Sequence, residues 1–373
     1  MTWKRGALAD FMADCVVYRN LEPLDPRLEG LRQIWRRIGL DHYYAPRKTT
    51  PEYAAALAEI MAQAQAARGV ASPLRHLLII GDTAMNDGAA ARNMARYWPM
   101  SGFIGAERLQ QAPSIELDGD LMLANRWTAL GEFLAWAQER GAACDESTAL
   151  LLDLDKTCIG ARGRNDKPID AARVTAVRRT MQAALGAALD EGAFLAVYDP
   201  LNQPQYHPFT ADNQDYLAYV CLMVLGQVYP AETFWADLRS GALASFGEFV
   251  ARCDAQCADM PAGLAQAHAE VCAGLAAEDP TPFKAFRRGE YLETVGRMDA
   301  LPDNATEGEV LAREIVITAE VASLATWMGR RDVLVFGISD KPDEASLPTA
   351  ELAAQGWLPL HRVRMKMYGQ DVV

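Results

Sequence analysis

Carboxylates follow two of the most apolar stretches of the chain. The stretch LLIIGDTAMNDG contains Asp82 and Asp87, and the stretch LLLDLDKT contains Asp153 and Asp155. In an open parallel sheet the carboxyl ends of the strands meet at one edge, so these side chains are expected to lie close together. Carboxylates at such short range repel one another unless a cation lies among them, and a site made of oxygen atoms favours Mg²⁺. The pattern therefore predicts a Mg²⁺ site at this edge of the sheet.

Each of these polar residues also has a purely structural explanation. An aspartate after a strand often caps a helix or closes an Asx turn, and Ser339 after VLVFGIS could cap the next helix in the same way. Caps do not require a D-x-D-x-T string, however, and the chain has one at 153–157. The chemical interpretation is therefore favoured for the set as a whole.

Strands and helices alternate on both sides of a long middle segment. HLLII, ALLLDLD and VLVFGIS are short apolar runs typical of strands buried on both faces. Helical patterns cover 51–68, 127–140 and 311–329, and the first opens with a proline and stops at a glycine. The alternation predicts an α/β fold with a doubly wound parallel sheet.

The middle of the chain has a different pattern. It is mostly helical, and AFLAVYD at 193–199 is its one competing strand pattern. We therefore expect a discontinuous α/β core at 1–158 and 332–373, with a helical cap domain inserted at 159–331.

Four motifs of the predicted core resemble those of the haloacid dehalogenase (HAD) superfamily of phosphatases. The first, a strand followed by D-x-D-x-T, is matched by Asp153-Leu154-Asp155-Lys156-Thr157, and the second, a strand ending in serine or threonine, by Ser339. The resemblance covers roughly 45–160 and 332–373 and leaves out the helical middle.

The third and fourth motifs stand before the first. A lysine that opens a helix is matched by Lys48 in KTTPEYAAAL, with Pro51 and Glu52, and G-D with a second acid is matched by Gly81, Asp82 and Asp87. The family order is first to fourth, whereas here it is third, fourth, first, second. This order implies a circularly permuted core, which is permissible because a sheet needs its strands in place and not in one chain order.

Two details of the resemblance have alternatives. The spacing from Asp82 to Asp87 is one residue longer than the commonest variant, so Asn86 could share the outer role at the metal. Lys366 in HRVRMKMYG competes with Lys48 for the motif lysine. Lys48 is favoured because the helix and the acids follow it.

The resemblance implies a role for each motif residue. Asp153 would be the nucleophile that forms an aspartyl-phosphate, and Asp155 the general acid and base. Mg²⁺ would be held by Asp153, Asp82 and the backbone carbonyl of Asp155, and Asp87 would support the metal from behind. Ser339 and Lys48 would bind phosphate oxygens. Weaker candidates for substrate binding are Thr157, Arg162 and Arg164, and the two arginines could equally belong to a solvated loop.

The helical middle contains further candidates. Tyr198, Asp199 and His207 are expected in a loop, and Arg287 with Arg288 on the surface face of a helix. A possible zinc site is formed by two pairs with helical i, i+4 spacing: Cys253, Cys257, His268 and Cys272. Core packing is the favoured explanation for these four, because cysteine is also a small buried hydrophobe.

The bulk properties exclude several classes of partner. The net charge is −13 and the pI about 4.9, which argues against nonspecific binding to nucleic acid or anionic membrane. LAYVCLMVLGQVY is too short to span a bilayer, and the first twenty residues contain no secretory signal. Seven scattered cysteines are typical of a reducing compartment, so a cytoplasmic protein is expected.

The function expected from these observations is a Mg²⁺-dependent phosphatase for a small phosphorylated substrate. A phosphomutase or phosphotransferase would use the same Asp153 and Asp155. A non-catalytic binding or assembly subunit on the same fold is the alternative from another class. The sequence leaves the oligomeric state open.

Overall fold

The computed structural model describes residues 3–186 and 189–373 and divides into two compact units. The first unit comprises Met1–Ala171 with Thr294–Val373, and the second comprises Ala172–Glu293. The boundaries fall within two helices, α6 (Lys167–Leu185) and α13 (Lys284–Val295). The second unit is thus shorter at both ends than the expected cap at 159–331.

The first unit is a mixed α/β structure built on a seven-stranded sheet. In spatial order its strands are β2 (Val16–Val17), β9 (Leu334–Ile338), β7 (Thr148–Asp153), β3 (His76–Gly81), β4 (Met100–Gly105), β6 (Leu121–Ala124) and β5 (Ile115–Asp118). All neighbouring strands run parallel except β5, which is antiparallel to β6. The three strands predicted from apolar runs are β3, β7 and β9, and they are adjacent, so the parallel sheet is confirmed.

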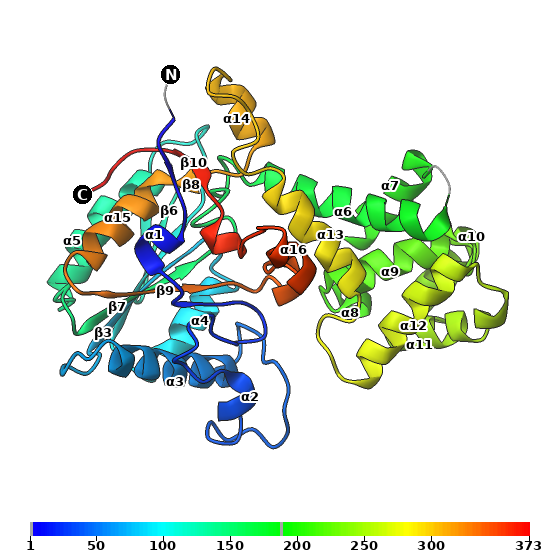
Figure 1. Ribbon diagram of the computed structural model, residues 1–373, viewed down its shortest axis with the longest axis horizontal. Coiled ribbons are helices and arrows are strands. Elements are labelled where there is room, and N and C mark those ends of the chain that lie inside the picture. Colours follow the sequence, from blue (N-terminus) through cyan, green and yellow to red (C-terminus); the bar gives the residue numbers. More distant parts are fainter. Residues whose placement is uncertain (1–2, 187–188) are drawn as a thin grey trace. The chain divides into compact units, whose positions relative to one another are not determined.

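Helices cover both faces of this sheet. Alternate residues of β3 and β7 point to opposite sides, as the twofold period of a strand requires. Leu78 and Leu150 join one apolar cluster with α1 (Ala9–Met12), α5 (Leu130–Glu139) and α15 (Ala319–Gly329). Leu77 and Leu151 join another with α2 (Leu31–Ile34), α3 (Pro51–Ala67) and α4 (Asp87–Met94). Figure 1 shows α5 and α15 on one side of the strands and α3 on the other. The apolar runs are continuous because both faces are covered.

The expected single helix over 311–329 is wrong. The segment forms α14 (Glu307–Arg313), the short strand β8 (Ile317–Thr318) and then α15. β8 pairs with β10 (Met365–Tyr368), which pairs with β1 (Arg5–Gly6), so a second sheet of three strands forms. The run Ile315, Val316, Ile317 is β-branched, and the amide of Gly160 donates to the Val316 carbonyl at 2.9 Å.

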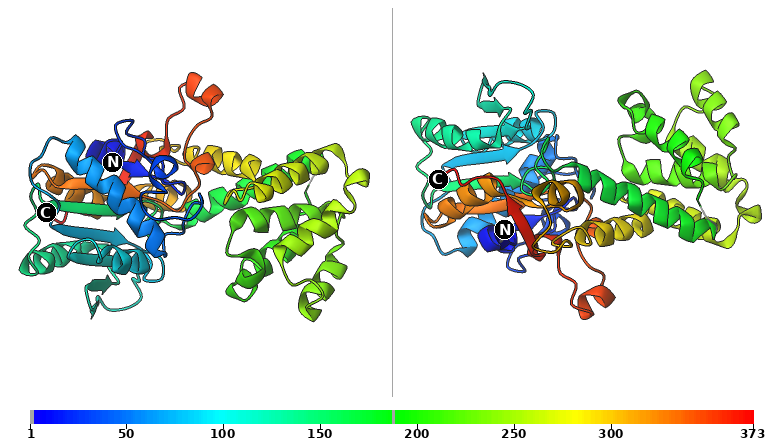
Figure 2. Two further views of the ribbon diagram at one scale, coloured as in Figure 1. Left: turned by 90° about the horizontal axis from the view of Figure 1, so that it is seen from below. Right: turned by 90° about the horizontal axis from the view of Figure 1, so that it is seen from above.

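The second unit consists of helices in the part that the structure describes (Figure 2). Besides most of α6 and α13, these are α7 (Glu191–Leu201), α8 (His207–Thr210), α9 (Gln214–Leu225), α10 (Ala231–Ser240), α11 (Phe246–Asp254) and α12 (Ala262–Ala276). The strand suggested by the pattern at 193–199 does not form, because these residues lie in α7. Asp190 caps this helix by accepting a hydrogen bond from the Ala193 amide at 3.0 Å.

The apolar stretch LAYVCLMVLGQVY is explained by α9. Every residue from Leu217 to Val224 is buried, which is typical of a helix surrounded by other helices. The remaining helix is the short α16 (Ala350–Ala354) in the first unit. Among the described residues, no helix has the length and apolar character needed to cross a bilayer.

Candidate functional site

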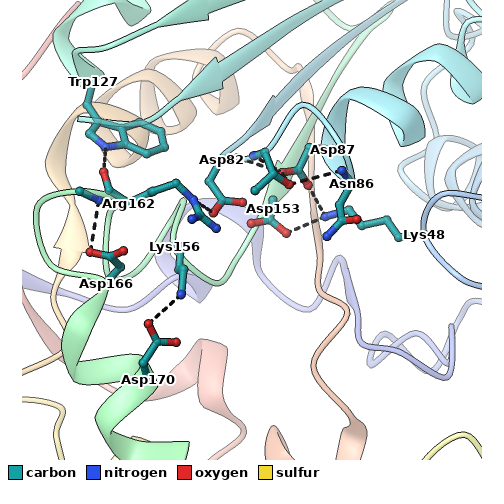
Figure 3. Close-up of polar contacts among 12 residues, drawn as sticks. Lys48, Asp82, Asn86, Asp87, Trp127, Asp153, Lys156, Arg162, Asp166 and Asp170 are labelled. Atoms are coloured by element: carbon teal, nitrogen blue, oxygen red, sulfur yellow. Dashed lines mark hydrogen bonds and ion pairs between the residues drawn. The ribbon is translucent and has the colours of Figure 1, made fainter. Parts of the chain in front are cut away.

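The carboxyl ends of three adjacent strands carry the predicted site residues. Asp153 is the last residue of β7, Asp82 follows β3 directly, and Ser339 follows β9 directly. β7 lies between the other two strands, and β3 and β7 pair in register from His76↔Thr148 to Ile80↔Leu152. This register brings the side chains of Asp82 and Asp153 to the same edge of the sheet, where they face one another (Figure 3).

Lys48 joins two of the acids. Its Nζ lies 2.5 Å from Asp87 Oδ1 and 2.6 Å from Asp153 Oδ1, and all three side chains are buried. Lys48 stands just before α3, whose N-terminus is fixed by Thr50 accepting from the Tyr53 amide and by proline at the first helical position. The competing Lys366 lies on β10 and binds Glu314 at 2.9 Å. The structure therefore places Lys48 at the acids.

Asp87 ties the end of β3 to the first turn of α4. Its Oδ2 accepts hydrogen bonds from the backbone amides of Asp82 and Thr83, each at 2.9 Å. A Cβ on Gly81 would lie 2.3 Å from the Asp87 Cβ, closer than real Cβ contacts allow, so this approach requires glycine. Asn86 immediately precedes α4, and its backbone amide donates to Thr83 Oγ1 at 3.4 Å.

The three carboxylates, Asp82, Asp87 and Asp153, together carry more negative charge than the neighbouring Lys48 neutralises. Burial raises the pKa of Asp153 well above its ordinary value, and the Asp87 and Asp82 carboxylates add to this rise against Lys48. Burial and Asp87 likewise raise the pKa of Asp82 to about 7. Burial also opposes ionisation of Asp87, but Lys48 and the Thr83 amide outweigh it and lower the pKa of Asp87. A cation beside Asp82 and Asp153 would relieve this unfavourable burial of charge.

The turn after β7 delivers Arg162 to the same cluster. Lys156 has a φ of +64°, a left-handed conformation that reverses the chain inside the D-x-D-x-T string. The turn is closed by the Arg162 amide donating to the Lys156 carbonyl at 2.8 Å, and the Trp127 indole donates to the Arg162 carbonyl at 3.3 Å. The Arg162 Nε then donates to Asp82 Oδ2 (Figure 3).

Arg164 does not reach the cluster. Its guanidinium is buried and forms ion pairs with Glu107 at 2.7 Å and Glu320 at 3.0 Å. Glu107 follows β4 and Glu320 lies in α15, so this arginine joins separate parts of the first unit. The guanidinium of Arg164 is thus already paired with two protein carboxylates, and Arg162 is the arginine of this turn that contacts the acids.

The remaining motif residues lie around Lys341, which the sequence analysis missed. Lys341 Nζ lies 3.5 Å from Asp155 Oδ2, and the Lys341 amide donates to Ser339 Oγ at 3.0 Å. The Lys341 side chain is buried, although it is only two residues from Ser339. The sequence could have indicated Lys341 through its position two residues after Ser339 in VLVFGISDKPDEA.

Two buried hydroxyls near the acids have no hydrogen-bond partner among the described residues. One is Thr157 Oγ1, at the end of the D-x-D-x-T string. The other is the hydroxyl of Tyr53 in α3, whose pKa is raised by burial, while the charge of nearby Lys48 lowers it and that of Asp153 raises it. Tyr53 was also missed, although it is five residues after Lys48 in KTTPEYAAAL.

The three buried acids could hold a metal ion. Asp82, Asp87 and Asp153 each offer a carboxylate oxygen, and these atoms lie within 4.8 Å of one another. Asp153 Oδ2 is buried and accepts no hydrogen bond in the part of the chain that the structure describes. A buried carboxylate oxygen without a donor is costly, and a divalent cation bound by oxygen ligands would satisfy it. The donor set fits Mg²⁺.

Several expectations for the helical middle need correction. Tyr198 and Asp199 lie in α7 and His207 begins α8, so the expected loop is wrong. Arg287 is not on a surface face, because its guanidinium is buried and contacts Asp215 at 2.7 Å. Pro200 lies inside α7 and Pro208 in the first turn of α8, so neither proline keeps these residues out of helices. Arg287 is buried together with its partner Asp215, which comes from α9.

The four residues of the possible zinc site, for which core packing was favoured, are only partly brought together. His268 and Cys272 contact each other on α12, with 3.5 Å between Nε2 and Sγ. Cys253 is buried on α11, and Cys257 is exposed in a separate 3₁₀ turn at Cys257–Asp259. Beside His268 and Cys272 lies a third side chain that could bind a metal ion, Asp254.

Comparison of the chain with protein-family models finds no match, and comparisons with curated proteins and with solved structures find none either. The chemistry of the site is therefore inferred from its own residues and geometry.

Proposed function

We propose that the protein is a Mg²⁺-dependent phosphatase that hydrolyses a small phosphorylated compound through an aspartyl-phosphate on Asp153. The observation that carries the proposal is the state of the Asp153 carboxylate at the end of the central strand. Lys48 binds its Oδ1 at 2.6 Å, while its buried Oδ2 accepts no hydrogen bond from the described residues. Lys48 orients one oxygen and no described protein group donates to the other, so the carboxylate is held ready for a cation and for attack on phosphorus.

The two chemical steps follow from the residue types. As a carboxylate oxygen of Asp153 forms its bond to phosphorus, the bond to the leaving oxygen breaks, and Asp155 gives that oxygen a proton. Asp155 then takes a proton from the water that attacks the aspartyl-phosphate, which releases phosphate and restores Asp153. The bound Mg²⁺ would neutralise phosphoryl oxygens and orient the group for in-line attack.

Protein groups around Asp153 support these steps. Asp82, with Asp153 and the backbone carbonyl of Asp155, would hold the cation, and Asp87 would support it while fixing Lys48. Ser339 and Lys48 would bind the remaining phosphoryl oxygens. Lys341 Nζ lies 3.5 Å from the Asp155 carboxylate and would help to hold it in position.

The sheet order supports the resemblance to a permuted HAD core. The strands that carry the fourth, first and second motifs are β3, β7 and β9, and they are direct neighbours. Their motif residues share one edge although the third and fourth motifs come first in the chain. The helical unit is inserted in the sequence between β7 and β9, where a cap that selects the substrate would be placed.

The test is hydrolysis of p-nitrophenyl phosphate by the full chain, with Mg²⁺ and with EDTA. We expect activity that requires Mg²⁺, is abolished in Asp153→Asn, and falls roughly 10²–10⁴-fold in Asp155→Asn. Asp118→Asn is the matched control, because Asp118 lies in β5, exposed and away from the acid cluster. Activity that survives in Asp153→Asn would overturn the assignment of the nucleophile.

A cap that rejects p-nitrophenyl phosphate would hide an intact site, so a second measurement is needed. Beryllium fluoride mimics a phosphoryl group on a carboxylate. Its Mg²⁺-dependent binding to the wild type, and not to Asp153→Asn, would support the proposal without any turnover. Absence of both hydrolysis and beryllium fluoride binding would leave a non-catalytic role for the fold.

A further inference from the structure

A second cluster of metal-ligand side chains lies in the helical unit. Asp254 is the last residue of α11, and His268 and Cys272 are one turn apart on α12. His268 Nε2 lies 3.1 Å from Asp254 Oδ1 and 3.5 Å from Cys272 Sγ, and the three ligand atoms all lie within 4.8 Å of one another.

These separations match the edges of a tetrahedral zinc site. With typical Zn–N and Zn–S bonds, tetrahedral angles place the nitrogen about 3.5 Å from the sulfur, and about 3.3 Å from a carboxylate oxygen. The observed separations are 3.5 and 3.1 Å. One ion can therefore reach all three atoms without a large movement of either helix.

Tyr219 fixes the His268 ring in the orientation that a metal requires. The Tyr219 hydroxyl lies 2.6 Å from His268 Nδ1, and the two rings are nearly parallel, with an angle of 25° between them. If Tyr219 accepts from Nδ1–H, His268 Nε2 carries no proton and keeps its lone pair for an ion that Asp254 and Cys272 also bind. This is the outer hydrogen bond that metal-binding histidines usually make.

A hydrogen-bonded network without metal explains the cluster less completely. A single proton on Nε2 can serve either Asp254 or Cys272, yet both converge on this nitrogen. The Asp254 side chain is 67% exposed and could be solvated by water instead, whereas the His268 side chain is only 5% exposed. The exposed side of the cluster would also give an ion a path from solvent.

We infer that Asp254, His268 and Cys272 form a binding site for Zn²⁺, with water in the fourth position. Imidazole and thiolate ligands select zinc over Mg²⁺, so this site differs in chemistry from the acid cluster of the first unit. The ion would link the end of α11 to the middle of α12. The inference is independent of the proposed phosphatase activity.

The experiment uses the full chain after chelator treatment and titrates it with Co²⁺, which replaces Zn²⁺ and reports its ligands. We expect a thiolate-to-cobalt charge-transfer band in the wild type, and Zn²⁺ should displace it. The band should be lost in Cys272→Ser and weakened in Asp254→Asn. Cys257→Ser and Cys15→Ser are the matched controls and should retain it.

Tyr219→Phe tests the ring-orienting hydrogen bond. Loss of such an outer partner lowers metal affinity about 10–100-fold, and the phenyl ring preserves the packing of α9. Circular dichroism of each variant checks the fold. The Asp153→Asn variant should keep the band, because a carboxylate gives no thiolate transition. A band that persists in Cys272→Ser, or Zn²⁺ affinity that is unchanged in both Cys272→Ser and Asp254→Asn, would overturn the inference.

Discussion

Replacing Lys48 by methionine should strongly destabilise the first unit when Mg²⁺ is absent. Methionine keeps an unbranched chain of similar size but removes the charge that lies between Asp87 and Asp153. All three side chains are buried, so water cannot replace the lost partner. Two carboxylates would then remain without a cation in a low-dielectric site.

The size of the effect follows from this burial. Breaking a buried ion pair from one side costs about 3–5 kcal/mol, which for a domain of this size lowers the melting temperature by roughly 6–20 °C. The pair between Arg92 and Asp118 has the same kind of bond at 2.6 Å, but both side chains are more than half exposed. Removing that pair by Arg92→Met should cost at most about 1 kcal/mol.

Urea unfolding followed by tryptophan fluorescence in EDTA would measure these costs. All tryptophans except Trp235 lie in the first unit, so the signal reports on the unit that contains the site. The double variant Lys48→Met/Asp153→Asn should be more stable than Lys48→Met alone, because one of the two unpaired charges is gone. A Lys48→Met protein within about 1 kcal/mol of the wild type, with no coupling to Asp153, would refute this account.

Three further predictions concern residues on and away from the site. Gly81→Ala should push Asp87 aside, because a Cβ at this position would lie 2.3 Å from the Asp87 Cβ. Thermal melts of this variant should then show no stabilisation by Mg²⁺. The control Gly308→Ala, which has open space around the new Cβ, should behave as wild type. Lys366→Met should lower the free energy of unfolding in urea by about 3–5 kcal/mol, because it leaves the buried Glu314 carboxylate without its cation. The folded Lys366→Met protein should nevertheless keep Mg²⁺-dependent hydrolysis, unlike Lys48→Met. Burial lowers the pKa of His361 from 6.5, so the folded state keeps the ring neutral where the unfolded chain takes up a proton. Stability should therefore fall as the pH drops below about 6.5, and the urea midpoint of His361→Gln should change less between neutral pH and about pH 5.5.

The part of the fold that sequence predicts well is the part where an apolar run ends in polar residues. β3, β7 and β9 are strongly apolar, and the acids or serine that follow them mark the edge of the sheet. β4 contains Ser101 and Gly102 among its apolar residues, and β8 is only two residues long, so neither gives a period that could be recognised. Their pairing is decided by tertiary contacts.

The side chains of the site show the same division. Asp82, Asp87, Asp153 and Lys48 are recognisable because their motifs are local, and the structure brings them together. The fate of Arg164 depends on Glu107 and Glu320, which no local pattern associates with it. Partners that come from distant segments therefore decided which of two nearby arginines, Arg162 or Arg164, contacts the acids.

The position of β2 at the edge of the large sheet has a consequence for folding. Its neighbour in the sheet is β9, with Val16 opposite Gly337, so an early segment of the chain must wait for a late one. On the ribosome, β3, β4 and β7 emerge and can pair before the helical unit is made, and β9 arrives only after that unit. Pairing of β9 with β7 and β2 across such long separations is entropically slow, and until β9 docks one edge of β7 remains open. A chain truncated before residue 334 would therefore contain Asp82, Asp87, Asp153 and Asp155 but lack β9, and its sheet would be prone to aggregate.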